Sequence, residues 1–185
     1  MPRKFMFTRE KVLAAALDLV REQGIAAVTA RGLGKKLGSS SKPIFSLFEN
    51  MEDVLSAVME AANELYQSYL KEDMASGKYP PYKASGMAYI RFAKEEKELF
   101  KLLFMRDRSH ESRKDKEENK TLIELIQQNL DISEEDAYLF HLEMWISVHG
   151  MATMLATSYL ELDEEFISRV LTDGYEGMKN RYTGD

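Results

Sequence analysis

Side chains suited to holding phosphate groups and base edges are concentrated in one short stretch near the N-terminus. The expected donors to phosphate oxygens come first: Thr29, Arg31, Lys36 and Ser40. Groups expected to meet base edges, thymine methyls or sugars follow: Ser41, Lys42, Pro43 and Phe45. Phosphate contacts position a protein on a duplex, whereas base contacts read its sequence. The chemistry predicted for this stretch is therefore non-covalent recognition of double-stranded DNA.

Two short helices around a glycine turn are predicted to position these groups. Thr29 can cap the first helix, and Gly38 supplies the backbone freedom that ends it. Pro43 fits the first turn of the second helix, where a missing N–H is tolerated. Phe45 and Phe48 are three residues apart, so they are expected on one face of that helix. This order is that of a helix-turn-helix, whose second helix enters the major groove.

The same stretch resembles the helix-turn-helix of the TetR family of bacterial transcriptional regulators, without a gap. The matching positions are Thr29, Arg31, Leu33, Gly34, Lys35, Lys36, Leu37, Gly38, Ser39, Ser40, Ile44, Phe45, Phe48, Glu52, Asp53 and Val54. A second, softer likeness joins Trp145, His149 and Gly150 to a signature of some TetR-type ligand domains. The resemblance implies a homodimeric regulator, usually a repressor, that binds operator DNA and responds to a small-molecule effector.

Some residues depart from that pattern. Phe45 replaces the usual tyrosine and Met51 the usual lysine, which removes two phosphate contacts. Gly34 suits a close helix crossing, but Gly32 has no evident role and costs the helix about 1 kcal/mol against alanine. These departures favour a lower DNA affinity. The alternative is a ligand-sensing or protein-interaction module whose DNA binding is weakened.

Charge is divided unevenly along the 185 residues. Residues 1–50 hold nine Lys/Arg against four Asp/Glu, a balance of +5, and the remainder holds sixteen against twenty-seven, a balance of −11. A basic head keeps attraction for phosphate local. Arg3 and Lys4 are expected to extend it as an arm along the duplex. Without a long apolar run or a signal-peptide core, we expect a cytoplasmic protein with no membrane contact.

Helical periodicity dominates the whole chain and predicts an all-α fold of about nine helices. In addition to the two helices of the motif, helices are predicted over 8–23, 50–76, 82–94, 96–105, 114–129, 134–158 and 163–181. The expected domains are a DNA-binding head at 1–50 and a ligand-binding and dimerisation domain at 51–185. The mixed-charge stretch 106–120 is predicted to be a solvated surface segment, with a lid over a pocket as the lesser alternative.

The predicted helix 134–158 is apolar on nearly every side, so it must be buried on every side. One side is expected to meet a second subunit, with Phe166, Val170 and Leu171 completing a four-helix seam that includes Met151. The other side is expected to face a mainly apolar effector site.

Large, adaptable side chains are available for that site: Met59, Tyr66, Met87, Phe104, Trp145 and His149. The competing interpretation is that these residues are simply core. Catalysis is not expected, because no phosphate loop or nucleophile motif is present. No cofactor or metal is expected either, because the chain has no cysteine and His141 and His149 are eight residues apart.

Overall fold

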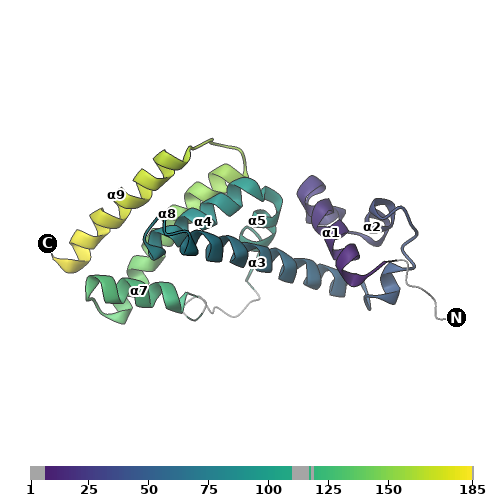
Figure 1. The fold of residues 1–185 in the computed structure, drawn as a ribbon, viewed down its shortest axis with the longest axis horizontal. Coiled ribbons are helices and arrows are strands. Elements are labelled where there is room, and N and C mark those ends of the chain that lie inside the picture. The colour runs from purple at the N-terminus through teal and green to yellow at the C-terminus, as the bar shows by residue number, and fades with distance from the viewer. Residues whose placement is uncertain (1–6, 110–116, 118, 185) are drawn as a thin grey trace. The chain divides into compact units, whose positions relative to one another are not determined.

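The computed structural model describes residues 7–109, 117 and 119–184, and within them every regular element is helical (Figure 1). The α-helices are α1 (Arg9–Gln23), α2 (Ala30–Lys36), α3 (Met51–Ala75), α4 (Pro81–Glu95), α5 (Lys97–Phe104), α7 (Lys120–Leu130), α8 (Glu134–Ala156) and α9 (Glu164–Thr183). Two 3₁₀ turns, η1 (Ile25–Ala27) and η2 (Ile44–Ser46), lie between the first helices. The predicted all-α class is confirmed. The arm at Arg3 and Lys4 and residues 110–116 and 118 of the mixed-charge stretch lie outside the described residues.

Helix starts are fixed by capping side chains, among them the predicted cap Thr29. The capping residues are Thr8, Thr29, Asn50, Ser133 and Asp163. Each side-chain oxygen accepts a hydrogen bond from the backbone N–H three residues further along, over 2.7–3.3 Å. These bonds satisfy donors that a helix start otherwise leaves without partners, so the start of each helix is set locally.

The described chain divides into two compact units. The first contains the described parts of 1–67 together with 96–106, and the second contains 68–95 and the described parts of 107–185. Helix α3 contributes to both, because the division falls within it. The functional boundary expected at residue 50 stays a prediction.

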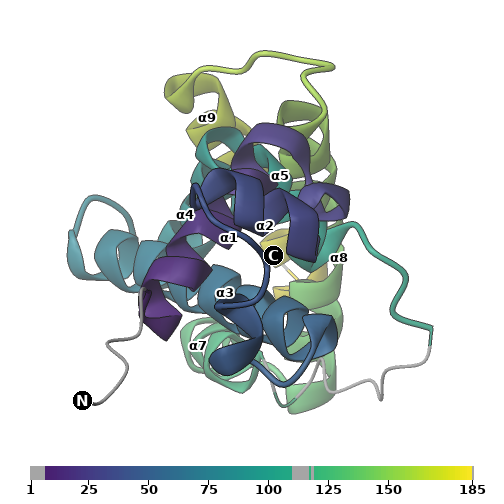
Figure 2. The same ribbon diagram turned by 90° about the vertical axis from the view of Figure 1, so that its right-hand side faces the viewer.

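In the first unit, α1 lies against α2 and α5, as both views show (Figure 1 and Figure 2). Val12 and Val20 on α1 and Leu33 on α2 are fully buried. Arg21 on α1 also forms a two-pronged ion pair with Glu96, just before α5, and both N···O distances are 2.8 Å. The head is therefore held both by apolar packing and by a planar guanidinium–carboxylate contact.

In the second unit, α4 packs against α7, α8 and α9. Gly86 on α4 faces Leu171 and Val148, since a Cβ there would lie 3.4 Å from the first and 3.5 Å from the second, at ordinary van der Waals distance. Leu171 is therefore part of the core of this unit, which corrects its expected place in a seam between subunits.

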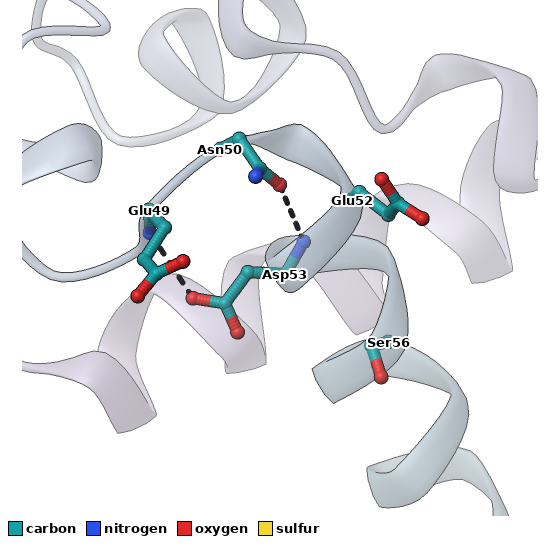
Figure 3. Close-up of a pocket in the computed structure, with 5 residues that line it drawn as sticks. All are labelled: Glu49, Asn50, Glu52, Asp53 and Ser56. Atoms are coloured by element: carbon teal, nitrogen blue, oxygen red, sulfur yellow. Dashed lines mark hydrogen bonds between the residues drawn. The ribbon is translucent and has the colours of Figure 1, made fainter.

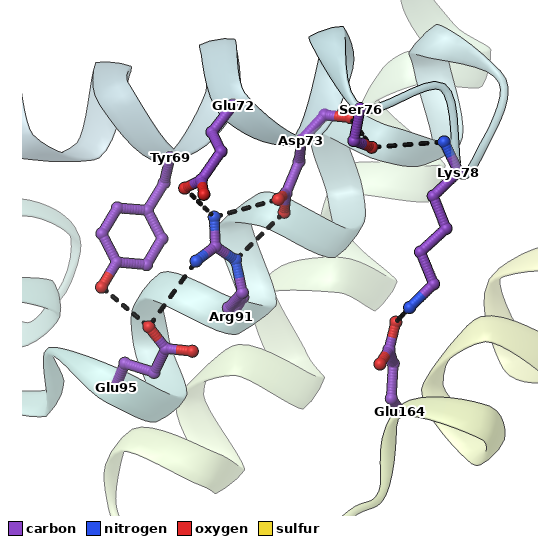
Figure 4. Close-up of polar contacts among 8 residues, drawn as sticks. All are labelled: Tyr69, Glu72, Asp73, Ser76, Lys78, Arg91, Glu95 and Glu164. Carbon is purple, nitrogen blue, oxygen red and sulfur yellow. Dashed lines mark hydrogen bonds and ion pairs between the residues drawn. The ribbon is translucent and has the colours of Figure 1, made fainter.

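A polar cluster joins the end of α3 to α4 in the second unit (Figure 4). The guanidinium of Arg91 lies over the ring of Tyr69, 4.2 Å from its centroid. It donates to Asp73 from two nitrogens, at 2.9 and 3.2 Å, and to Glu72 at 2.9 Å. Glu95 accepts from the Tyr69 hydroxyl at 2.8 Å. One arginine thus organises three carboxylates where these two helices meet.

The sides of α8 differ more than its sequence suggests. Its inner side buries Phe140, Met144, Val148, Met151 and Leu155. Met151 is thus a core residue of its own unit, and its expected place in a seam between subunits is corrected. Another side exposes large apolar residues: Leu139, Ile146 and Met154. None of the described helices is both long enough and apolar enough to cross a membrane.

Candidate nucleic-acid interface and ligand domain

The helix-turn-helix is built around α2 and the turn that follows it. Thr29 caps α2 through the N–H of Gly32 at 3.0 Å. Gly38 ends the helical stretch with φ at +62°, a conformation that glycine adopts without strain. The predicted first helix and glycine turn are therefore confirmed in their local geometry.

The second helix of the motif is shorter than predicted. It is the 3₁₀ turn η2, with the N–H of Leu47 donating to the carbonyl of Ile44 at 2.9 Å. The expectation that Phe45 and Phe48 share a face is wrong, because Phe45 is 43% exposed and Phe48 only 2%. Three-residue spacing places side chains together only while a regular helix continues, and this one ends between them.

Two glycines of α2 have packing roles. A Cβ on Gly34 would lie 3.0 Å from the carbonyl oxygen of Ser39, in agreement with the predicted close crossing. A Cβ on Gly32 would lie only 2.4 Å from the carbonyl oxygen of Ala27. Helical periodicity does not indicate that contact, because Ala27 belongs to the preceding turn rather than to α2.

The predicted DNA-binding side chains differ in how available they are. Arg31, Ser40, Lys42 and Phe45 are exposed, while Ser41 and Pro43 are half-buried. The Thr29 hydroxyl serves as the helix cap. Lys36 donates from Nζ to Glu22 on α1 at 2.5 Å, so its charge is already paired. The structure therefore gives these eight residues unequal access to a duplex.

Arg9 is a structural residue of this region that the sequence interpretation missed. Its guanidinium lies 4.1 Å from the Phe48 ring centroid and donates to the Leu47 carbonyl at 3.1 Å. It also forms an ion pair with Asp53 at 3.0 Å, and this lowers the pKa of the Asp53 carboxyl. Residues 39–48, which follow Gly38 and are named the recognition turn from here on, are thereby connected at their end to the start of α3. The sequence pattern around Arg9 does not indicate its contact with Asp53, because the two residues are far apart in the chain.

A shallow polar depression lies at the start of α3 (Figure 3). Its lining residues are Glu49, Asn50, Glu52, Asp53 and Ser56. The Asn50 side chain accepts from the Asp53 N–H at 2.9 Å, and the Asp53 carboxylate accepts from the Glu49 N–H at 3.1 Å. These bonds are those of a helix cap, so the depression has a structural explanation.

The predicted ligand residues of the first unit are Met59, Tyr66 and Phe104. Tyr66 meets the Phe104 ring edge-on, with ring centroids 5.1 Å apart. Burial raises the pKa of the Tyr66 hydroxyl, which therefore stays protonated at neutral pH. Met59 on α3 is half-buried.

The predicted ligand residues of the second unit are Met87, Trp145 and His149. The Trp145 ring stacks on His149 with centroids 4.9 Å apart, and it remains 39% exposed. The Tyr89 hydroxyl lies 2.9 Å from Nδ1 of His149, and burial lowers the pKa of this histidine. Met87 is buried. The grouping of the six predicted residues into one effector site stays a prediction, because they belong to separate units.

Three solved structures are similar to this chain in fold. A TetR-like transcriptional regulator from Rhodococcus sp. RHA1 has a TM-score of 0.68 at 15% identity, covering 91% of this chain and 94% of its own. A putative TetR-family regulator from Vibrio parahaemolyticus has a TM-score of 0.63 at 16% identity, covering 91% and 97%. SmeT, the repressor of the Stenotrophomonas maltophilia multidrug efflux pump SmeDEF, has a TM-score of 0.54 at 17% identity, covering 96% and 90%.

The sequence itself supplies the deciding match. Residues 82–173, from the first turn of α4 to the middle of α9, match the family model of the tetracyclin repressor-like C-terminal domain. The chain belongs to the TetR family. TetR-family proteins are transcriptional regulators rather than enzymes. The helix-turn-helix resemblance in residues 29–54 and the family-model match over residues 82–173 point to the same family. No curated protein gives a significant sequence match.

Proposed function

We propose that this TetR-family regulator binds operator DNA as a homodimer through α2 and the recognition turn. We also propose that a small, mainly hydrophobic effector releases it. The observation that carries the DNA-binding part is the exposure of Arg31 and Lys42 on either side of the Gly38 turn. Both belong to the segment of the chain whose charge is positive. Exposed cations beside a helix-turn-helix are suited to contact phosphate.

Sequence reading is proposed to come from the recognition turn. Lys42 and Phe45 are exposed there, so an ammonium and an aromatic ring are available to base edges and thymine methyls. Because the turn is short, each head offers few base contacts. A modest specificity per half-site follows, and pairing two half-sites is the way to raise it.

Dimerisation is proposed to cover the exposed apolar residues of α8 and α9. Ile146 is 59% exposed, and Leu139, Met154 and Phe166 are also large, apolar and exposed. Gly150 on α8 and Gly177 on α9 have open space where a Cβ would lie, so another helix can approach closely at both. A dimer would present two heads to half-sites about 34–36 Å apart.

Effector binding is proposed to involve the predicted aromatic and methionine side chains on α3, α4, α5 and α8. Release then requires that the ligand and the operator favour different arrangements of the protein. Helix α3 is the proposed carrier, because it runs from the head into the second unit as one continuous helix. Coupling of about 1–3 kcal/mol between the two ligands is typical, and it is reciprocal.

The test is fluorescence anisotropy with a labelled duplex from the region upstream of the protein's own gene. Arg31→Ala should weaken binding to every duplex and reduce the salt slope by about 1, whereas Lys71→Ala on the exposed surface of α3 should do neither. Lys42→Ala should weaken binding and relax the preference for one sequence, because its contact is expected with base edges. The single tryptophan, Trp145, reports on effector binding in the same sample. If the unaltered protein binds no duplex even at low salt, the alternative function is correct, namely a ligand-sensing or protein-interaction module whose DNA binding is weakened.

A further inference from the structure

Lys36 differs from Arg31, Lys35 and Lys42, the cations nearest to it around the Gly38 turn, because a carboxylate already neutralises it. Its Nζ lies 2.5 Å from an Oε of Glu22. Arg31, Lys35 and Lys42 are exposed, and none has a carboxylate partner within the part of the chain that the structure describes. The pair joins Glu22 in the last turn of α1 to Lys36, the last residue of α2. Lys36 therefore lies at the end of the helix that leads into the recognition turn.

Glu22 has few other ways to compensate its charge. It lies in the last turn of α1, where the negative end of the helix dipole disfavours a carboxylate. The neighbouring Arg21 is committed to Glu96 through two bonds of 2.8 Å. Lys36 is therefore the cation that balances Glu22, and any other use of Lys36 leaves an uncompensated carboxylate at a helix end.

We propose that Glu22 lowers the affinity of this protein for DNA by competing with phosphate for Lys36. The inference rests on the proposed DNA binding and adds a regulating residue to it. A phosphate contact by Lys36 must first break the pair with Glu22 and leave that carboxylate near the duplex. The contact therefore contributes less than one made by a free cation such as Arg31. The effect is independent of DNA sequence, because only the phosphate backbone is involved.

The experiment measures the affinity of the full chain for a duplex of arbitrary sequence over a range of salt concentrations. Glu22→Gln keeps the shape of the side chain and removes the charge from the dipole's negative end, so the variant should fold. We expect its affinity to rise about twofold to fivefold at low salt, the range of an exposed ion pair. The gain should shrink as salt screens the pair.

Two controls separate this effect from a general change of charge. Glu64→Gln changes the net charge equally, but Glu64 is an exposed residue of α3 without an ion pair in the described residues. It should leave the affinity nearly unchanged. In a Lys36→Gln background, Glu22→Gln should also give no gain, because the two residues act as one unit.

Three results would overturn the inference while the proposed function stands. They are an unchanged affinity in Glu22→Gln, an equal gain in Glu64→Gln, or a full gain that persists without Lys36. The last would mean that Glu22 repels DNA directly. Absence of duplex binding in the unaltered protein and in every variant would instead refute the proposed DNA binding, and this inference with it.

Discussion

His141 should make the stability of the protein depend on pH from about 6.5 downwards, so the dependence begins above the range in which carboxylates titrate. The residue is 7% exposed on α8, and its Nδ1 lies 3.2 Å from the Tyr82 hydroxyl. Its buried Nε2 has no hydrogen-bond partner within the described residues. Burial lowers the pKa of His141 from 6.5 to about 4. Between pH 6.5 and about 4 the folded protein therefore keeps this ring neutral, while the ring is mostly protonated in the unfolded chain.

The sign and size of the effect follow from proton linkage. Between pH 6.5 and 4 the unfolded chain binds a proton at His141 and the folded protein does not. The free energy of unfolding therefore falls as pH falls. Above pH 6.5 no stability is lost through this group. Below pH 4 the complete loss amounts to about 3 kcal/mol of the free energy of unfolding. From about pH 7 to about pH 5.5 the expected loss is about 1 kcal/mol, while most carboxylates remain ionised.

Urea unfolding at these two pH values measures the effect, with His141→Gln and His141→Phe as controls that cannot titrate. The unaltered protein should lose about 1 kcal/mol more than either variant. His149 has a pKa that burial also lowers, but it is present in all three proteins and cancels in the comparison. An equal loss in all three would mean that His141 is solvated or protonated in the folded state, and the reasoning would be refuted.

Three further perturbations test other parts of the structure. Gly32→Ala should lower the melting temperature by the equivalent of about 1–2 kcal/mol despite alanine's better helix propensity, because its Cβ would lie 2.4 Å from the Ala27 oxygen. Ile146→Glu should shift light scattering from dimer towards monomer with the helical circular dichroism unchanged, and an unaffected dimer would place the seam elsewhere. Arg91→Gln should cost about 1 kcal/mol in chemical unfolding, because it removes the shared partner of the surrounding carboxylates; an unchanged midpoint would mean that the cluster contributes nothing net.

The sequence predicted best what is decided within a few residues. The cap at Thr29 and the turn at Gly38 depend on neighbours in the chain, and each has the predicted local geometry. The family resemblance in the head was equally local, because it depended on an ungapped run of residues. It is supported by the independent match of residues 82–173.

Contacts between distant segments were beyond reach of the sequence. Glu22 and Lys36 are fourteen residues apart and belong to different helices, so neither periodicity nor a motif pairs them. The same holds for Arg9 and Asp53, which hold the end of the recognition turn. The candidate DNA-binding residues could therefore be named by type, but their availability could not. Only the fold tells which cation is free and which is already paired.

Helix α8 illustrates how the fold divides a pattern that is uniform in sequence. Its residues are apolar nearly all round, which predicts burial without saying what covers each side. Met144 and Met151 are buried by their own unit, whereas Leu139 and Ile146 are not. Four large apolar residues on α8 and α9 are exposed to water. Exposed apolar patches on proteins usually mark interaction sites, because they otherwise promote aggregation. The helices of the second unit already bury the inner side of α8. A second copy of α8 and α9 can bury the exposed side as well, and it requires no further protein. The exposed residues of α8, rather than its average apolarity, are thus the feature that favours a dimer.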